Sequence, residues 1–185
     1  MKSIASLSIA LFASAAFTGA MAQTYVSGSV GQGSVDVDCA GIASCDKKGT
    51  AFKVTGGYAY GNGISAELGY IDFGKAKFTD AGVNASASAS GFSLGAAFEM
   101  PVAQDFTLGA RLGIASLKTK ISGSVSGLGS ASVSETNAAP YYGFYGAYAV
   151  SKTTRIEFGA DFSRGEFDGE KADVRALTAG LRFVF

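Results

Sequence analysis

This chain of 185 residues contains no histidine and no tryptophan, and it has only two prolines and two cysteines. Without histidine, it lacks the commonest general base of hydrolases and the commonest metal ligand. Lys plus Arg and Asp plus Glu number 15 each, so no excess of positive charge marks a nucleic-acid surface. The sequence therefore predicts a protein without catalysis, without a metal or cofactor, and without nucleic acid as a partner.

Residues 1–22 have the three parts of a secretory signal peptide. Lys2 precedes an apolar run, and Ala20, Met21 and Ala22 form a small-residue cleavage site. The alternative is a transmembrane helix, but the run is interrupted by Ser and Thr and falls short of the roughly 20 apolar residues of a bilayer span. We expect export, followed by one mature domain at residues 23–185.

Beyond residue 22 the chain alternates with a period of two, which is typical of strands. Three short turns, at residues 61–63, 101–104 and 151–153, alternate with four longer connections, at 35–49, 76–87, 118–137 and 165–171. The eight alternating segments are residues 24–34, 50–60, 64–75, 88–100, 105–117, 138–150, 154–164 and 172–185. This pattern predicts an all-β fold, an eight-stranded antiparallel up-and-down barrel, with both mature ends on the short-turn side. The Ser/Ala alternation at 84–90 favours extended hairpins over disordered loops for the long connections.

The two faces of these segments differ in size and polarity. One face carries large apolar residues such as Phe92, Leu94 and Phe158, and the other carries small, polar or charged residues such as Gly95, Arg111 and Glu157. A soluble barrel would bury the bulky face, whereas a membrane barrel turns it toward lipid. Export and the aromatic end of the chain favour a transmembrane barrel in a Gram-negative outer membrane. We interpret Tyr58, Tyr60, Tyr142 and Tyr148 as aromatic girdles at the membrane interfaces; the alternative is that they are ordinary strand aromatics.

Four acidic and four basic residues lie on the face predicted to point inward. They are Lys53, Glu67, Glu99, Arg111, Arg155, Glu157, Asp161 and Arg182. Charges in such a narrow bore must pair, because an isolated buried ion costs several kcal/mol. We interpret them as a network of ion pairs that closes the barrel; the alternative is a gated ion path whose pairs exchange partners. Tyr141 and Tyr145 are expected to point into the bore beside them.

The two cysteines, Cys39 and Cys45, are close together in a predicted loop. In an exported chain this pair predicts a disulfide, since two thiols without histidine do not make a metal site. Acidic residues in the connections could bind divalent cations or approach lipopolysaccharide through them, but solvated loop charges are the simpler interpretation. These are Asp36, Asp38, Asp46, Asp80, Glu166, Asp168 and Glu170.

The opening strand at 23–33, the hairpin at 50–78 and the closing sequence ADVRALTAGLRFVF at 172–185 together resemble the OmpA-like family of eight-stranded outer-membrane barrels. The resemblance covers essentially all of the mature chain, but the motifs that carry it, the alternation, the glycines and the terminal Phe, are not specific. It implies a narrow, blocked bore, with Phe183 and Phe185 as a lipid anchor and Phe185 as the signal for the barrel assembly machinery. Many relatives continue into a peptidoglycan-binding domain, whereas this sequence stops at Phe185, so cell-wall tethering is not expected.

Taken with the resemblance, the sequence predicts a non-catalytic integral outer-membrane protein. Its expected role is envelope integrity or contact with surfaces, ligands or other cells through its extracellular loops, and its expected partners include outer-membrane lipid and lipopolysaccharide. A small, low-conductance channel for ions or solutes is the alternative. A lipid-modifying enzyme is a third hypothesis, which the lack of histidine disfavours.

Overall fold

The computed structural model describes residues 23–36, 44–80, 83–125, 129–167 and 169–185, and it consists of β-strands. No helix among these residues is long and apolar enough to cross a membrane. The strands are β1 (Gln23–Val35), β2 (Ser44–Asp46), β3 (Lys48–Ala59), β4 (Ile64–Asp80), β5 (Val83–Pro101), β6 (Phe106–Val125), β7 (Gly129–Ala149), β8 (Thr154–Phe167) and β9 (Glu170–Val184). The predicted signal peptide, residues 1–22, lies outside the described residues and stays a prediction.

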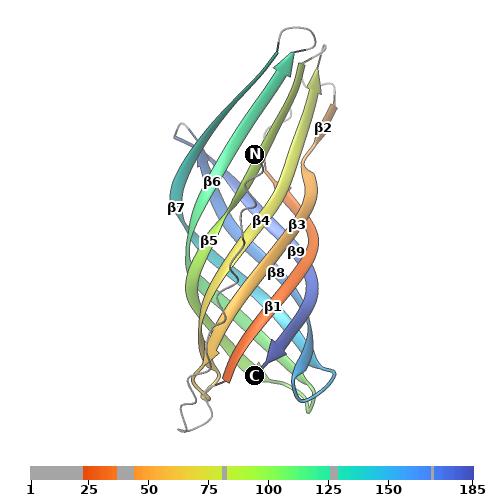
Figure 1. Ribbon diagram of the computed structural model, residues 1–185, viewed down its shortest axis with the longest axis vertical. Coiled ribbons are helices and arrows are strands. Elements are labelled where there is room, and N and C mark those ends of the chain that lie inside the picture. The colour runs from red at the N-terminus through yellow and green to blue at the C-terminus, as the bar shows by residue number, and fades with distance from the viewer. Residues whose placement is uncertain (1–22, 37–43, 81–82, 126–128, 168) are drawn as a thin grey trace, which may run out of the picture.

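The strands form one antiparallel sheet that closes on itself (Figure 1). Each strand from β3 onward pairs with the next in sequence, β1 pairs with both β3 and β9, and the pairing of β4 with β5 completes the ring. The short strand β2 pairs with β4 beyond the end of the β3–β4 ladder, so it continues the β3 position. The fold is therefore a closed eight-stranded antiparallel barrel, as the alternation predicted.

The four strands β4 to β7 are longer than predicted. They have 17, 19, 20 and 21 residues, and in Figure 1 they extend well beyond the others at one end of the barrel. The sequence analysis assigned residues 76–87 and 118–137 to connections, but paired strand occupies them up to Asp80, Val83, Val125 and Gly129. The expected extended hairpins are thus confirmed. Ala76 and Ala89 of these hairpins belong to the buried cluster, whereas the small Ser and Ala side chains nearer the tips specify the strand register only weakly.

Two other predicted connections also contain strand. The segment 35–49 contains β2 and the first residues of β3, because the extension of β4 supplies a pairing edge that the local sequence does not reveal. The segment 165–171 contains the ends of β8 and β9, which pair as far as Phe167 and Glu170. The predicted strands of these hairpins therefore ended too early at the tips, where consecutive strands pair with each other almost up to the turn.

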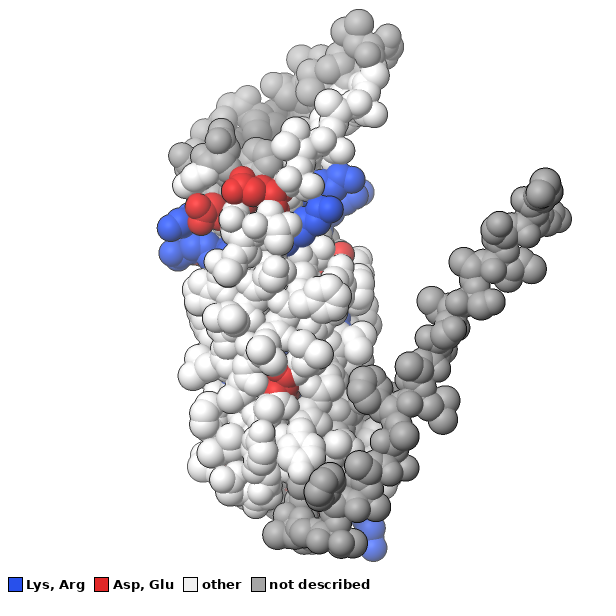
Figure 2. Space-filling model, turned by 60° about the vertical axis from the view of Figure 1, so that its left-hand side comes forward, with Lys and Arg blue, Asp and Glu red and all other residues white. Residues whose placement is uncertain are grey.

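The outer face of the barrel carries a continuous apolar belt. Large apolar side chains on every strand of the ring are exposed, among them Val30, Phe52, Leu68, Leu94, Leu112, Phe144, Phe158 and Leu181. In Figure 2 this belt shows as an almost uncharged zone, with Lys, Arg, Asp and Glu gathered above it. Exposed apolar side chains on all sides suit a hydrocarbon environment and would aggregate in water.

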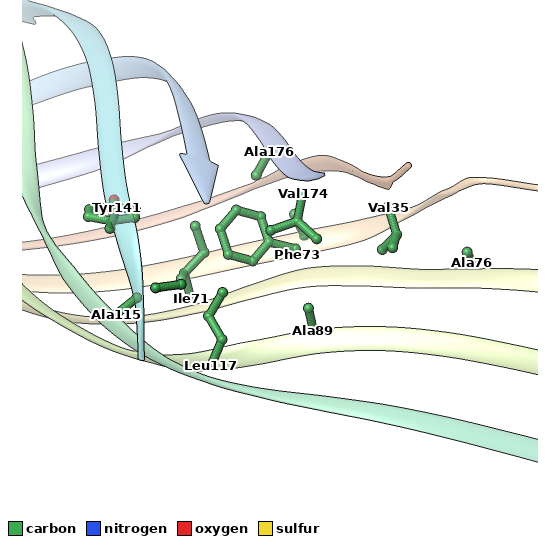
Figure 3. Packing of buried hydrophobic residues seen from close by; sticks show 12 residues of the cluster. Val35, Ile71, Phe73, Ala76, Ala89, Ala115, Leu117, Tyr141, Val174 and Ala176 are labelled. Atoms are coloured by element: carbon green, nitrogen blue, oxygen red, sulfur yellow. The ribbon is translucent and has the colours of Figure 1, made fainter. Parts of the chain in front are cut away.

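The bore also holds an apolar layer that the sequence analysis missed. Ile71, Phe73, Leu117 and Val174 are fully buried and point toward one another inside the barrel (Figure 3). Tyr141 lies at one end of the cluster, and Val35 lies toward the long-hairpin end. We call these four residues Ile71, Phe73, Leu117 and Val174 the apolar layer. The inner face was expected to carry small, polar or charged residues together with Tyr141 and Tyr145, so this apolar layer is a correction.

Candidate functional site

All eight charged residues predicted on the inner face take part in ion pairs with one another. They come from six strands, β3, β4, β5, β6, β8 and β9. Six of them are buried, whereas Glu99 and Arg155 are partly exposed at the short-turn end. Strand parity places them there, because each lies an even number of residues from the inward-facing residues of its own strand.

The larger group is a chain of six alternating charges. Arg111 contacts Glu67 through Nε at 2.8 Å and Glu157 through Nη2 at 2.7 Å. Arg182 contacts the other Glu157 oxygen at 2.5 Å and also pairs with Glu99. Arg155 completes the chain at 3.6 Å from Glu99. Three positive and three negative groups cancel, so the cluster adds no net charge to the bore.

A second, smaller group lies between this chain and the apolar layer. Lys53 Nζ lies 2.5 Å from Asp161 Oδ2, and the Tyr141 hydroxyl donates to the other Asp161 oxygen. Both ionised side chains are almost fully buried. This pair is also neutral, and Tyr141 connects it with the apolar layer, to whose cluster the ring belongs.

Two further tyrosines cover the arginines of the larger group. Tyr25 donates to Glu67 at 2.5 Å and Tyr145 donates to Glu99 at 2.8 Å. The Arg182 guanidinium lies 4.3 Å from the centre of the Tyr25 ring. Such contacts supply cation–π attraction and occupy the remaining space around the charges. Tyr141 and Tyr145 thus point inward as predicted, whereas the role of Tyr25 was missed, although it shares the face of Ser27 and Ser29.

The charges of this arrangement neutralise one another, and its side chains fill the bore. Every carboxylate of the network is held by a cation, and no group of three or more His, Cys, Asp or Glu able to hold a metal occurs among residues 23–36, 44–80, 83–125, 129–167 and 169–185. Buried pairs with several hydrogen bonds keep their geometry because an unpaired charge would be costly. The geometry fits a fixed closure of the bore.

The remaining predicted site residues lie elsewhere. Phe183 and Phe185 are exposed at the short-turn end of the barrel, and the Phe185 amide donates to the Thr24 carbonyl at 2.9 Å. Cys39 lies outside the described residues, so its disulfide with Cys45 stays a prediction. Of the acidic loop residues, Asp36 pairs with Lys47 at 3.4 Å.

Comparison with known proteins gives the same fold. No curated protein matches this chain. Among solved structures, Ail of Yersinia pestis, in complex with the heparin analogue sucrose octasulfate, has 20% identity and a TM-score of 0.60, covering 88% of this chain and 99% of its own. Neisserial surface protein A has 15% identity and a TM-score of 0.62, covering 88% and 97%. The N-terminal β-barrel domain of Pseudomonas aeruginosa OprF has 12% identity and a TM-score of 0.55, covering 89% and 100%.

These likenesses, all at low identity, show the fold. The family model for the outer membrane protein beta-barrel domain matches residues 4–185, nearly the whole chain. With the apolar belt and the closed ring of strands, this match places the protein in an outer membrane. The chain belongs to the outer membrane protein beta-barrel family.

Proposed function

We propose that this protein is a non-catalytic outer-membrane anchor that presents the two long hairpins, β4–β5 and β6–β7, for contact with surfaces outside the cell. One observation carries the proposal: the bore is filled by charge pairs and an apolar layer, while four strands continue far beyond the apolar belt. Because the bore is filled with side chains, the hairpins are the surface that remains available to partners.

The proposal includes a topology, with the long hairpins outside and the short turns in the periplasm. Barrels of this kind have short periplasmic turns and long outer loops. The last strand, β9, carries Phe183, and Phe185 follows it at the short-turn end, where both residues would meet lipid and the barrel assembly machinery during insertion. The apolar belt supplies the contact with membrane lipid.

The Ail structure suggests which outer surface to test first. That protein was crystallised with a heparin analogue, so sulfated glycans and host cells that display them are the natural first targets. The two chains share 20% identity, so the ligand class is tested on this chain itself.

The test shortens both hairpins and leaves the barrel intact. In one variant, an Asn-Gly turn replaces residues 78–85 and a second replaces residues 121–133. These cuts fall at the opposed pairs Lys77–Ser86 and Lys120–Ser134, so each ladder can close in a two-residue turn. We expect cells with the full-length protein to adhere to host cells or immobilised glycan. Cells with the shortened protein should adhere no better than cells without the protein. Equal adherence by both, with heat-modifiable gel mobility showing folded barrels, would overturn the proposal.

A small ion channel is the second candidate. The eight ionised groups in the bore favour it, because a chain of pairs could exchange partners and pass an ion. The apolar layer next to them argues against it, since a desolvated ion would have to cross buried side chains. Conductance of the refolded barrel in a planar bilayer decides between the two.

A further inference from the structure

Four lysines on the long hairpins surround a column of serines. Lys75 and Lys77 lie on β4 and Lys118 and Lys120 lie on β6, on either side of β5. Ser88 lies opposite both Lys75 and Lys120, Ser86 lies opposite Lys77, and Ser90 lies opposite Lys118. We call these seven residues the lysine–serine patch. The Cα atoms of lysines on opposite sides of β5 lie about 10 Å apart, and those of two lysines on the same strand lie about 7 Å apart.

A β-bulge places the two β4 lysines on this face. Asp72 lies opposite Ser90 and Lys75 lies opposite Ser88, so β4 has one extra residue between these pairs. Gly74 takes a positive φ of 86° there, and its amide donates to Asp72 Oδ1 at 2.7 Å. Without the bulge, the period-two alternation would turn Lys75 and Lys77 into the bore. The bulge turns both ammonium groups outward, beside the β6 lysines.

The patch carries more positive than negative charge, in contrast to two ion pairs elsewhere on the rim. Elsewhere Lys47 pairs with Asp36, and Arg164 pairs with Asp173 at 2.7 Å. The four patch lysines are exposed, and within the described part of the chain none lies in an ion pair. Asp46, opposite Lys77, and Asp72, opposite Ser90, border the patch. The four lysines outnumber these two carboxylates, so the patch keeps an excess of positive charge that can hold an external anion.

The lysine of the patch nearest the apolar belt, Lys118, lies at the height of the headgroup layer of a membrane. The last belt residues of β4 and β5 are Tyr70 and Phe92, which lie opposite each other. Ser116 lies opposite Phe92, and Lys118 is two residues further along, about 7 Å by strand rise. A bilayer with a core of about 30 Å and a total of 40–45 Å has headgroup regions of about 5–8 Å on each side. The first lysine therefore sits at the level of lipid phosphates.

A groove rises from the patch toward the hairpin tips. It has a volume of about 410 Å³, with Lys75 and Lys77 in its wall and Asn84, Ser86, Ser122 and Ser124 among the lining residues beyond them. Hydroxyl and amide groups bind sugar hydroxyls, and ammonium groups bind phosphate. From the membrane outward, the surface thus offers partners first for phosphate and then for sugar.

We infer that the lysine–serine patch binds the phosphorylated glycolipid of the outer leaflet, lipopolysaccharide, with its phosphates on the four lysines and its inner sugars in the groove above. This rests on the proposed topology with the long hairpins outside. The order of chemistry along the groove favours a membrane-embedded glycolipid over a soluble sulfated glycan, whose charges would not be confined to the membrane end.

The first experiment measures binding of purified rough lipopolysaccharide to the mature barrel in phospholipid nanodiscs. The variants are K75Q/K120Q, which removes the two lysines on either side of Ser88, and the control K171Q/R175Q, which removes the same charge from the exposed face of β9. We expect K75Q/K120Q to bind about tenfold more weakly or worse, the control to bind as the parent does, and dephosphorylated lipopolysaccharide to lose affinity for the parent. Equal weakening in both variants would overturn the inference, because the effect would then be one of total charge.

Two further experiments distinguish a wrong ligand from a wrong membrane topology. If heparin oligosaccharide competes fully and dephosphorylation has no effect, the patch serves a soluble glycan and the inference is wrong. An epitope inserted between β6 and β7 and probed on intact cells tests the topology by itself. An inaccessible epitope would overturn the proposed function and the physiological role of the patch, whereas the nanodisc result would still report whether the site binds phosphate. Heat-modifiable gel mobility shows for each variant that the barrel has folded.

Discussion

The guanidinium carbon of Arg111 lies 3.8 Å from the centre of the Tyr145 ring, in the middle of the bore. Arg111 is held at the same time by Glu67 and Glu157, so its charge is neutralised on one side and covered by an aromatic face on another. Tyr145 is fixed in turn by its hydrogen bond to Glu99. The ion pairs and the aromatic rings thus hold each other in place, and side chains fill the bore around Arg111.

Removal of Arg111 should be the costliest single change to the charge network. Arg111→Ala leaves Glu67 and Glu157 buried with fewer partners, and we expect a loss of about 3–5 kcal/mol in the free energy of unfolding. Arg155→Ala is the matched control, because Arg155 is partly exposed and makes one contact at 3.6 Å; its loss should be about 1 kcal/mol or less. Urea unfolding followed by circular dichroism measures both. Equal losses would mean that the network contributes little beyond surface pairing.

Opening the bore should require changes in both of its layers. Arg111→Ala alone should leave the barrel without conductance, because Phe73 and Leu117 still fill the bore on the long-hairpin side. Phe73→Ala with Leu117→Ala should also stay silent, because the ion pairs remain. The triple variant should conduct in planar bilayers. Steady conductance in the wild type would show that neither layer blocks the bore and would favour the channel hypothesis. Conductance in Arg111→Ala alone would show that the charge pairs are the only barrier.

Much of the fold could be predicted from local alternation, and so could the membership of the charge network. Period two fixes which face of a strand a residue occupies, so Lys53 and Asp161 could be placed in the bore without a structure. Their pairing could not be predicted, because they are 108 residues apart and which inner residues share a level depends on the shear of the closed barrel.

The apolar layer and the lysine–serine patch were missed for different reasons. Ile71 and Phe73 have the same parity as Glu67, so the alternation predicts that they point inward. The prediction for the bore considered charged residues and tyrosines and left these two apolar residues out. Lys75 and Lys77 have the parity of the inner face by simple counting, and only the bulge at Gly74 reverses them. A glycine can take the required positive φ at low cost, yet many glycines in this chain do not mark a bulge, so the sequence alone could not identify this one.

A charge placed on the apolar belt should destabilise the barrel according to its depth. Leu94 lies opposite Leu68 and Ile114, within the belt, and Leu94→Arg should cost about 2–4 kcal/mol in a bilayer. Val102 is exposed in the short turn after β5, and Val102→Arg should cost about 0–1 kcal/mol because it lies near the interface. Refolding yields and urea midpoints in lipid vesicles measure the difference. Equal costs would contradict the position of the belt.

Two adjacent glycines on β3 offer the sharpest test of the packed interior. Gly57 faces inward opposite Tyr25, and a Cβ there would lie 2.1 Å from the Tyr25 ring, whereas a Cβ on Gly56 would meet no atom within 4 Å. The Tyr25 ring cannot simply swing away, because its hydroxyl is hydrogen-bonded to Glu67 and its face covers Arg182.

Gly57→Ala should therefore displace the Tyr25 ring and cost about 1–3 kcal/mol through overpacking, and loosening of the Glu67 hydrogen bond would add to this. Gly56→Ala should be neutral or stabilising by up to about 1 kcal/mol, because alanine reduces the freedom of the unfolded chain. Urea unfolding measures the free energy of unfolding of both variants. Each variant adds one methyl group to a glycine of the same strand, so they differ only in the face that receives it. If both variants unfold at the parent's midpoint, the bore has slack around Tyr25, and the interior is a loosely filled space in which ion pairs could rearrange.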